Sequence, residues 1–510
     1  MRKIVDGRRR ACSLVTTPIT MTKGNEVITP DQPGPLETPL QHEPQQRRVL
    51  GLSDLVMFYV VTTLSLRWVA VAAAAGPSSL MVWLIGLVTI FIPLALCVME
   101  LSSRYPQEGG MYVWSKHAFG DFSGYMTGWV YWISNLPYFP AILYFAASNA
   151  LYVVGDKGKG LQGSPTFFIM FSFGGLALAL VLNIVGLGVG KWLNNLGAIG
   201  AWLPVGLLCV AGAIAWHKVG SATRFEPASL RPTLSLSTAW IWAALLSGFT
   251  GAESASCLGG EIRDARRTIP RALLIAGVLI TAGYVLGTVA MLVLLPRQQL
   301  NGLEGIMQAL SSRGAQIGWY GLAPAVALLI CIANLGGVSA YLAAMSRLPF
   351  VAGIDRYLPA AFGRLHPKWG TPHISLIVQG ICSMIFVLLG QLGSTVQGAY
   401  QMLVSMTVIT TFVPYLFMFS ALIQLQSEPA EPRVLRIYGG KPVATFIGVL
   451  GFGATSLVIV ASAIPDASEP HKALAVAKTI LLSAVLFGGG AVLYWVGKLR
   501  GSKSNTKVIG

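Results

Sequence analysis

The sequence predicts an all-α integral membrane protein with twelve transmembrane helices. Of its 510 residues, 54% are hydrophobic and only 11% are charged, and the mean hydropathy is +0.65. A soluble globular protein of this length needs more polar surface than this composition provides. Apolar runs of about 20 residues, each long enough to cross a hydrocarbon core of about 30 Å, recur from residue 50 to residue 498. The chain is therefore expected to reside in a lipid bilayer.

The expected spans follow one another with short polar connections. We place them at residues 51–75, 80–102, 122–152, 166–189, 192–217, 237–259, 271–295, 319–345, 372–392, 398–425, 442–464 and 473–498. Residues 1–50 are polar and rich in Pro and Gln, with no cleavable signal, so a disordered cytoplasmic tail is expected there. Residues 499–510 are expected to form a second cytoplasmic tail.

Positive charge is distributed in a way that orients the chain. The formal net charge is +16, but Lys and Arg lie mostly in short loops, without the aromatic-interleaved basic patch of a nucleic-acid-binding surface. They are concentrated in the two tails and in the even-numbered loops, which the positive-inside rule assigns to the cytoplasm. We therefore expect both termini in the cytoplasm and no nucleic acid as a partner.

The sequence also lacks the usual signs of catalysis or metal binding. Five of the six cysteines lie inside apolar spans and none forms a CxxC motif, so they read as small buried side chains. The six histidines lie in the tail, in loops or at span ends, and neither HExxH nor a P-loop is present. We expect no enzymatic activity, no cofactor, no metal site and no ATP-driven pumping by this chain.

The first span contains polar residues and a full charge where a membrane helix is normally apolar. Thr62, Thr63, Ser65 and Arg67 fall in its middle. An ionisable side chain inside a membrane is costly and marks a functional site by default. The span is therefore expected to be discontinuous here, with free N–H groups at the start of its second half facing a substrate carboxylate.

The sixth span is interrupted more strongly. Gly248, Phe249, Thr250 and Gly251 break its apolar run, and Glu253 follows two residues later. Unwound backbone survives in a membrane only where it is buried in protein or lines a cavity. We expect unwound carbonyls here to meet a substrate amine, Phe249 to close over it, and Glu253 to exchange a proton. The structural alternative is a kink in which Glu253 only bonds to a neighbouring hydroxyl.

Two interrupted spans that stand five apart indicate an internal repeat. Two five-helix repeats of inverted topology place matching broken helices at the bilayer midplane. The first repeat then covers residues 51–217 and the second covers residues 237–425, with two additional helices in residues 442–498. This is a 5+5 inverted repeat with helices 1 and 6 discontinuous.

Several motifs resemble the amino acid–polyamine–organocation (APC) superfamily of secondary transporters. The run MELSSRYPQEGGMYVWSKHAFG, residues 99–120, is similar to the family signature E-x5-P-x2-G-G-x-Y-x-W. GFTGAESAS, residues 248–256, resembles the arginine/agmatine antiporter, and the basic run EIRDARRTIPRA and the exit of the eighth span, residues 344–372, also match the family. The resemblance implies the LeuT/APC fold and a transporter in the plasma membrane, the inner membrane of a bacterium.

Two features resemble the glutamate/γ-aminobutyrate antiporter branch in particular. The first span has T-T-L-S-L-R-W in place of the family's usual G-S-G-I-F, and Y-G-G-K-P follows the tenth span. The family's frequent fifth-span lysine would fall near Ala201, which puts a lysine-based proton mechanism in doubt. Ser247 stands where the arginine/agmatine antiporter has an aromatic gate residue. Phe249 is the candidate to act as the gate in its place.

The role of Arg67 has two interpretations. Its planar guanidinium group has paired N–H donors that match the geometry of a carboxylate, so Arg67 could bind a substrate carboxylate directly. Alternatively, Arg67 and Glu253 form a permanent pair that joins two helices. In either case a fixed positive charge in the pocket disfavours polyamines and favours zwitterions or anions.

Further polar residues in the spans are weaker candidates. Asn135 and Tyr131 in the third span, Asn334 and Ser339 in the eighth, and Tyr415 in the tenth are candidates to contact substrate, although polar residues of this kind more often form hydrogen bonds that pack helices together. Charged residues at the cytoplasmic span ends could form ion pairs that hold an outward-open state, or could serve only as a topology signal. These are Glu100, Arg104, Glu261, Arg263, Asp264, Arg266, Arg267, Arg347 and Arg364.

The leading hypothesis is a permease or antiporter that moves an amino acid or a related amine by alternating access. Protons or a counter-substrate are the candidate coupling partners, and the protein is expected as a monomer or homodimer. The alternative is a transport-inactive sensor or scaffold with the same fold, whose polar tail binds a soluble partner.

Overall fold

The structure is a computed structural model, and the regular secondary structure that it describes consists of helices joined by turns and loops. It describes residues 48–499 except 234, 236–237, 300–304, 320, 392–394, 430–433, 463–480 and 482–483. Within these residues no β-strand occurs, and the one β-like contact is an isolated bridge between Leu50 and Ile262. Of the expected tails, residues 1–50 and 499–510, all but residues 48–50 and 499 lie outside the described residues.

Among the described residues, nine helical stretches are long and apolar enough to cross a membrane, which makes this an integral membrane protein. They are Ser79–Arg104 (α3, Ser79–Gly86; η1, Leu87–Phe91; α4, Ile92–Arg104), α6 (Asp121–Val154), α7 (Pro165–Val185), α8 (Leu187–Val219), α10 (Ala265–Leu294), α12 (Leu322–Ile354), α13 (His373–Gln391), α14 (Val396–Leu425) and α15 (Gly440–Ser462). A tenth candidate is the bent pair α1 (Leu52–Thr63) and α2 (Leu66–Ala75).

Two expected spans look different in the structure. The sixth consists of a short helix, α9 (Ala239–Ser247), a turn, and a 3-10 segment, η3 (Ser254–Glu261). For the twelfth, residues 484–499 form an apolar helix, while most of the preceding expected segment lies outside the described residues. The expected number of twelve transmembrane helices therefore stays a prediction.

Short helices occupy several of the connections. These are α5 (Met111–Phe119), η2 (Gly155–Leu161), η4 (Arg297–Gln299), α11 (Gly305–Ile317) and η5 (Ala360–Gly363). The eighth span also extends further than expected, because α12 continues to Ile354 with the Arg347 side chain fully buried. Leu348, Phe350 and Ala352 are buried among other helices, so this extension of α12 is stabilised by packing within the protein.

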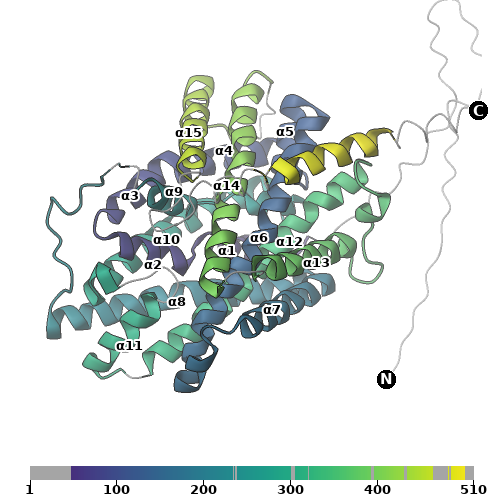
Figure 1. Cartoon of the computed structure of the whole chain (residues 1–510). Helices are drawn as coiled ribbons and strands as arrows, with labels where there is room; N and C mark the ends of the chain where they lie inside the picture. The colour runs from purple at the N-terminus through teal and green to yellow at the C-terminus, as the bar shows by residue number, and fades with distance from the viewer. Residues whose placement is uncertain are drawn as a thin grey trace, which may run out of the picture. The chain divides into compact units, whose positions relative to one another are not determined.

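The broken first span packs against α8, α10 and α12, and α12 also packs against η3 of the sixth span. α12 packs against α8 and α6, and α14 packs against α6 and α15 (Figure 1). Small residues allow the closest approach: a Cβ added to Gly336 of α12 would lie 2.6 Å from the Cα atom of Gly197 in α8. Such contacts are typical of membrane helices, which associate through small residues rather than through the hydrophobic effect.

The start of the first span is attached to the end of the sixth. The backbone N–H groups of Val49 and Leu50 donate to the carbonyl of Glu261, at 3.0 and 3.1 Å, and the N–H of Arg263 donates to the carbonyl of Leu50 at 3.0 Å. The two broken spans are therefore joined through their backbones at one end; the interruption follows this attachment in the first span and precedes it in the sixth.

Candidate functional site

The first span loses its helical winding between Thr63 and Leu66. α1 ends at Thr63, Leu64 and Ser65 are extended, and α2 starts at Leu66 with a bend of 42° between the two axes. No glycine or proline lies at this break, so its local sequence does not force it. The extended backbone is stabilised by tertiary contacts, because the N–H of Ser65 donates to the hydroxyl of Tyr284 at 3.2 Å.

The sixth span is broken by glycines and touches the first. Residues 248–253 form a turn between α9 and η3. Gly251 has a φ of +111°, and a Cβ at this position would lie 2.5 Å from the Tyr341 hydroxyl and 3.0 Å from the Thr62 carbonyl. Only glycine combines this backbone conformation with such a close approach. The expectation that both spans are discontinuous agrees with these geometries.

Both breaks open onto one cavity. Its walls come from the two interrupted spans and from α6, α12 and α14. The lining residues are Thr62, Thr63, Ser65, Arg67, Trp68, Tyr131, Asn135, Tyr138, Ser247, Gly248, Thr250, Glu253, Tyr341, Thr407, Val408, Thr411 and Phe412.

Glu253 lies at the cavity with its carboxylate held from several sides. The side chain is 1% exposed. Its Oε1 accepts a hydrogen bond from the Tyr131 hydroxyl on α6, and its Oε2 accepts the N–H of Gly251 at 3.0 Å. The same N–H lies 3.4 Å from the hydroxyl of Tyr415 on α14. The acid is therefore fixed between its own turn and two neighbouring helices, as a buried carboxylate requires.

Arg67 reaches the same cavity and is not paired with Glu253. Among the described residues no ion pair joins the two side chains, and the Nε and Nη1 atoms of Arg67 have no hydrogen-bond partner. The residue is 3% exposed, and its guanidinium carbon lies 4.2 Å from the Trp68 ring centroid and 5.7 Å from that of Tyr138. Aromatic rings thus stabilise the cation, while N–H groups at its edge stay available.

Four expected contact residues fall outside the cavity lining. Phe249 is fully buried behind the break, with its ring centroid 5.6 Å from those of Trp83, Phe91 and Tyr284. It lies in this aromatic cluster rather than over the cavity, because the turn directs its side chain toward α3 and α10. Gly251 and Tyr415 contribute through Glu253 and its turn.

Asn334 is bonded within its own helix, since its Nδ2 donates to the Ile330 carbonyl at 2.7 Å. Ser339, a weaker candidate on the same helix, pairs instead with Asn183 of α7, whose Nδ2 lies 3.0 Å from the serine hydroxyl. The Ser339–Asn183 contact joins two helices in the way that polar residues join membrane helices, whereas the Asn334 contact lies within α12.

Other lining residues did not stand out in the sequence. Tyr138 follows Tyr131 and Asn135 at helical spacing, so these three residues share one face of α6, and this periodicity could have identified Tyr138. Thr407, Val408 and Thr411 form a similar face of α14. Tyr341 on α12 and Trp68 carried no comparable signal, because aromatic residues are frequent throughout the spans.

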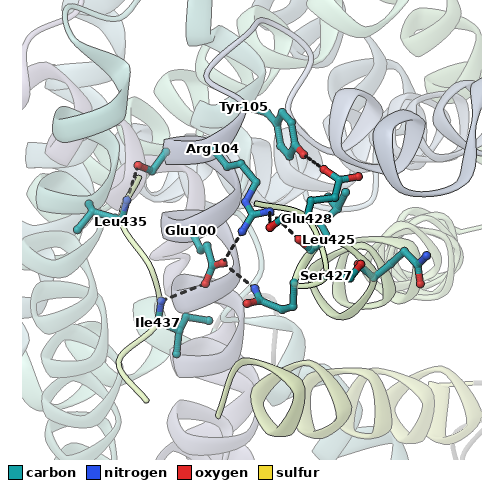
Figure 2. Close-up of polar contacts among 11 residues, drawn as sticks. Glu100, Arg104, Tyr105, Leu425, Ser427, Glu428, Leu435 and Ile437 are labelled. Carbon is teal, nitrogen blue, oxygen red and sulfur yellow. Dashed lines mark hydrogen bonds and ion pairs between the residues drawn. The ribbon is translucent and has the colours of Figure 1, made fainter. Parts of the chain in front are cut away.

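Four of the charged residues that were expected at the cytoplasmic span ends, Glu100, Arg104, Glu261 and Arg347, are buried in polar networks. Figure 2 shows the Glu100 carboxylate of α4 between Arg104 and the backbone of Ile437. Its oxygens accept the side-chain amide of Gln426 at 2.6 Å, the N–H of Ile437 at 3.0 Å and the Arg104 guanidinium at 3.4 Å. Arg104 also donates to the carbonyl of Leu425 at 2.6 Å. The signature glutamate thus binds the connection between α14 and α15.

Tyr105 completes this cluster just outside the span. Its hydroxyl donates to Oε2 of Glu428 at 2.7 Å (Figure 2). Partial burial, together with the neighbouring carboxylate, raises the pKa of Tyr105 to about 12. A second network centres on Arg347 of α12, whose Nη2 lies 2.6 Å from Oε1 of Glu261. The Arg347–Glu261 pair joins the ends of two different spans, while Glu100 and Arg104 of one helix bind the connection between α14 and α15.

Comparison with known proteins gives a consistent result. The sequence model described as amino acid permease matches residues 50–488. The chain is 30% identical to an uncharacterized transporter of Legionella pneumophila over 87% of this chain and 94% of that protein. It is 29% identical to an uncharacterized transporter of Mycobacterium tuberculosis over 66% of this chain and 72% of that protein. A probable agmatine/putrescine antiporter of Lactococcus lactis is 21% identical over 78% of this chain and 84% of that protein.

Proposed function

The chain belongs to the amino acid permease family of membrane transporters, and from this premise we propose that it moves an amino acid or a related amine by alternating access. Its relatives are named as transporters and permeases rather than as enzymes. The observation that carries the proposal is the meeting of both interrupted spans at one cavity that also receives Glu253 and Arg67. Broken helices at a shared site are the typical binding arrangement of secondary transporters.

We propose that a substrate carboxylate binds at the start of α2. The first N–H groups of a helix have no intrahelical acceptor and carry the positive end of the helix dipole. Arg67 lies in the first turn of α2 and directs unpartnered guanidinium nitrogens into the same region. A carboxylate at this place receives both the dipole and a charge-assisted, in-plane hydrogen bond.

A substrate amine is expected on the opposite wall. Ser247 and Gly248 line the cavity at the start of the sixth-span turn. The Ser247 carbonyl accepts both the N–H and the hydroxyl of Thr250, and the Gly248 carbonyl accepts the Tyr284 hydroxyl, so the second lone pair of Gly248 is the proposed acceptor for the amine. Glu253 follows on the same turn and supplies negative charge. This arrangement favours zwitterions, whose two charged groups match the two walls.

The positive charge of Arg67 in the pocket also favours some classes of substrate over others. The Lactococcus lactis relative is named as a probable agmatine/putrescine antiporter. Agmatine and putrescine each carry two positive charges near neutral pH. In the present chain a buried Arg67 would repel the second positive charge of a diamine. We therefore propose amino acids with a carboxylate as the preferred substrates, ahead of diamines.

Coupling and orientation are part of the same proposal. Ala201, at the expected position of the family lysine, is a buried apolar residue of α8, so Glu253 is the proposed group for proton exchange. A counter-substrate that uses the same cavity is the second coupling partner that we propose. The distribution of Lys and Arg supports a plasma-membrane protein with both termini in the cytoplasm.

Transport by the purified protein in liposomes tests the proposal. Labelled L-glutamate, L-leucine, L-arginine and agmatine would be offered with and without the unlabelled compound inside and with a pH gradient. Wild-type protein is expected to take up at least one amino acid, and Glu253→Gln and Gly251→Leu are expected to abolish the uptake. Glu226→Gln, which alters an exposed loop acid, is the matched control. Neither uptake nor binding of any compound by the wild-type protein would overturn the proposal.

A further inference from the structure

Tyr284 of α10 connects the two interrupted spans through a single hydroxyl group. The residue is fully buried. Its hydroxyl lies 2.5 Å from the carbonyl oxygen of Thr63 and 3.2 Å from the N–H of Ser65, both in the break of the first span. It also lies 2.7 Å from the carbonyl oxygen of Gly248, at the start of the sixth-span turn.

These three backbone groups are ones that helical hydrogen bonding leaves free. An unsatisfied backbone group in a membrane interior costs several kcal/mol, so each break requires an external partner. A phenol hydroxyl can donate one hydrogen and accept others. It can therefore accept from Ser65 and donate to one of the two carbonyls at a time. The one hydroxyl satisfies groups from spans that are far apart in the sequence.

The position of the hydroxyl is set by the packing of the ring. The Tyr284 ring is stacked on Trp83 of α3, with centroids 4.2 Å apart and planes 4° apart. The Trp83 indole N–H donates at 3.1 Å to the hydroxyl of Thr288, one turn further along α10. Trp83 thus contacts two residues of α10, stacking on Tyr284 and donating to Thr288, and this fixes the Tyr284 ring relative to the backbone of α10.

Small residues bring α10 close enough for this contact. A Cβ added to Gly283 would lie 2.9 Å from the side chain of Leu64, within the break of the first span. A Cβ added to Gly287 would lie 3.1 Å from the side chain of Val69. Glycines on both sides of Tyr284 therefore let α10 approach the first span until the hydroxyl reaches its backbone.

We propose that Tyr284 is a positioning residue that holds the two interrupted segments at a fixed separation, so that they move as one unit. Thr63, Ser65 and Gly248 all line the cavity, whereas Tyr284 lies outside its lining and acts only through them. The inference rests on the proposed function, since it assigns the geometry of the proposed binding walls to one side chain. It extends that function by naming the residue that fixes the distance between the first-span break, where the substrate carboxylate is proposed to bind, and the sixth-span turn, where the amine is proposed to bind.

Hydrogen–deuterium exchange of the purified full chain tests this inference without any substrate. Tyr284→Phe removes only the hydroxyl. The Tyr284 hydroxyl contacts both interrupted segments. Its loss is therefore expected to raise amide exchange about tenfold both in the peptides that cover residues 64–66 and in those that cover residues 248–252. Tyr125→Phe is the matched control, because the Tyr125 hydroxyl is buried without a partner among the described residues. The control is expected to leave both peptides unchanged.

Thr288→Val provides a milder second variant if Tyr284→Phe folds poorly. It removes the acceptor of the Trp83 indole and should raise exchange in the same two peptides by a smaller factor. An unchanged rate, or a rise in only one of the two segments, would overturn the positioning role. A rise spread evenly over α10 with a lowered Tm would show a packing role only and would also overturn it. Because the measurement needs no transport, its failure is distinguishable from failure of the proposed function.

Discussion

The hydroxyl of Tyr131, on α6, donates a hydrogen bond to the carboxylate of Glu253, in the turn that interrupts the sixth span. Tyr131 is 1% exposed and Glu253 is also 1% exposed, so neither group has ready access to water. The contact joins a continuous helix to a broken one at the cavity. Any movement of the sixth span away from α6 must break this bond or carry Tyr131 with it.

Tyr131→Phe is therefore expected to weaken both the fold and the site. Hydrogen bonds to charged groups contribute about 1.5–3 kcal/mol, so the variant should lose about 2 kcal/mol of stability and lower the Tm in detergent. Tyr125→Phe, which removes a buried hydroxyl without a partner among the described residues, should leave the Tm within experimental error. Equal Tm values for Tyr131→Phe and wild type would show that Glu253 does not depend on this donor.

Arg67→Gln is expected to change the preference of the transporter rather than its folding. The variant removes the positive charge, so uptake of L-glutamate and L-leucine should fall at least about tenfold, as expected for a lost charge-assisted bond, while competition by agmatine should become stronger. Arg67→Lys keeps the charge but not the planar fork, and intermediate values are expected. Competition assays in liposomes measure the ranking.

Arg271→Gln is the control for the Arg67 experiment, since Arg271 is exposed at the start of α10. An unchanged ranking of amino acids and agmatine in Arg67→Gln would contradict the proposed carboxylate site. A shift of the same size in the control would show a surface-charge effect instead.

Gly251→Ala is expected to destabilise the sixth-span turn. The backbone at Gly251 has a φ of +111°, and the new Cβ would lie 2.5 Å from the Tyr341 hydroxyl. Strain of this kind costs about 1–3 kcal/mol, which thermal unfolding can detect. Adding Tyr341→Phe should recover part of the loss by removing the clashing oxygen, but not the part that comes from the backbone.

Gly174→Ala tests whether the Gly251 effect is specific. Gly174 lies in α7, and nothing lies within 4 Å of a Cβ built there. Alanine in a helix interior should stabilise the protein by about 0.5–1 kcal/mol. If Gly251→Ala were as stable as Gly174→Ala, the left-handed conformation assigned to residue 251 would be wrong.

Glu100→Gln is expected to release the connection between α14 and α15. The carboxylate accepts bonds from Gln426, Ile437 and Arg104, and an amide offers one acceptor oxygen and an unwanted donor. Removing one partner of a buried ion pair costs about 3–5 kcal/mol. Amide exchange in residues 434–437 should therefore rise strongly, while Glu226→Gln should leave it unchanged. Equal exchange in both variants would contradict the proposed stabilisation of residues 434–437 by the Glu100 contacts that Figure 2 shows.

The sequence was sufficient to locate both interruptions and the acid beside them. Arg67 and Glu253 are expensive inside a membrane, so their presence marks a site even without a structure. The absence of an Arg67–Glu253 pair among the described residues could not be foreseen. It depends on the rotation of α2, which points Arg67 toward Trp68 and Tyr138.

The contribution of Tyr284, unlike that of the candidates Tyr131 and Tyr415, was hidden in the sequence. Tyr284 lies in an apolar helix, and its type alone does not distinguish it from a packing residue. Its role becomes visible only when α10 is placed against Leu64 and Gly248 in three dimensions. For Phe249 the sequence suggested a role that the structure does not support. Its place in the motif suggested a gate residue, but its ring packs against Trp83 outside the cavity lining.

Protection of introduced cysteines by substrate tests the central claim most directly. Ser65→Cys, from the first break, and Thr250→Cys, from the sixth, would be labelled with N-ethylmaleimide in a background without native cysteines. Val278→Cys, on the exposed face of α10, is the control. Whichever of L-glutamate, L-leucine and L-arginine drives uptake is expected to slow labelling at both break positions and not at the control. Protection at neither break, or at only one of them, would contradict a shared pocket formed by the two interrupted helices.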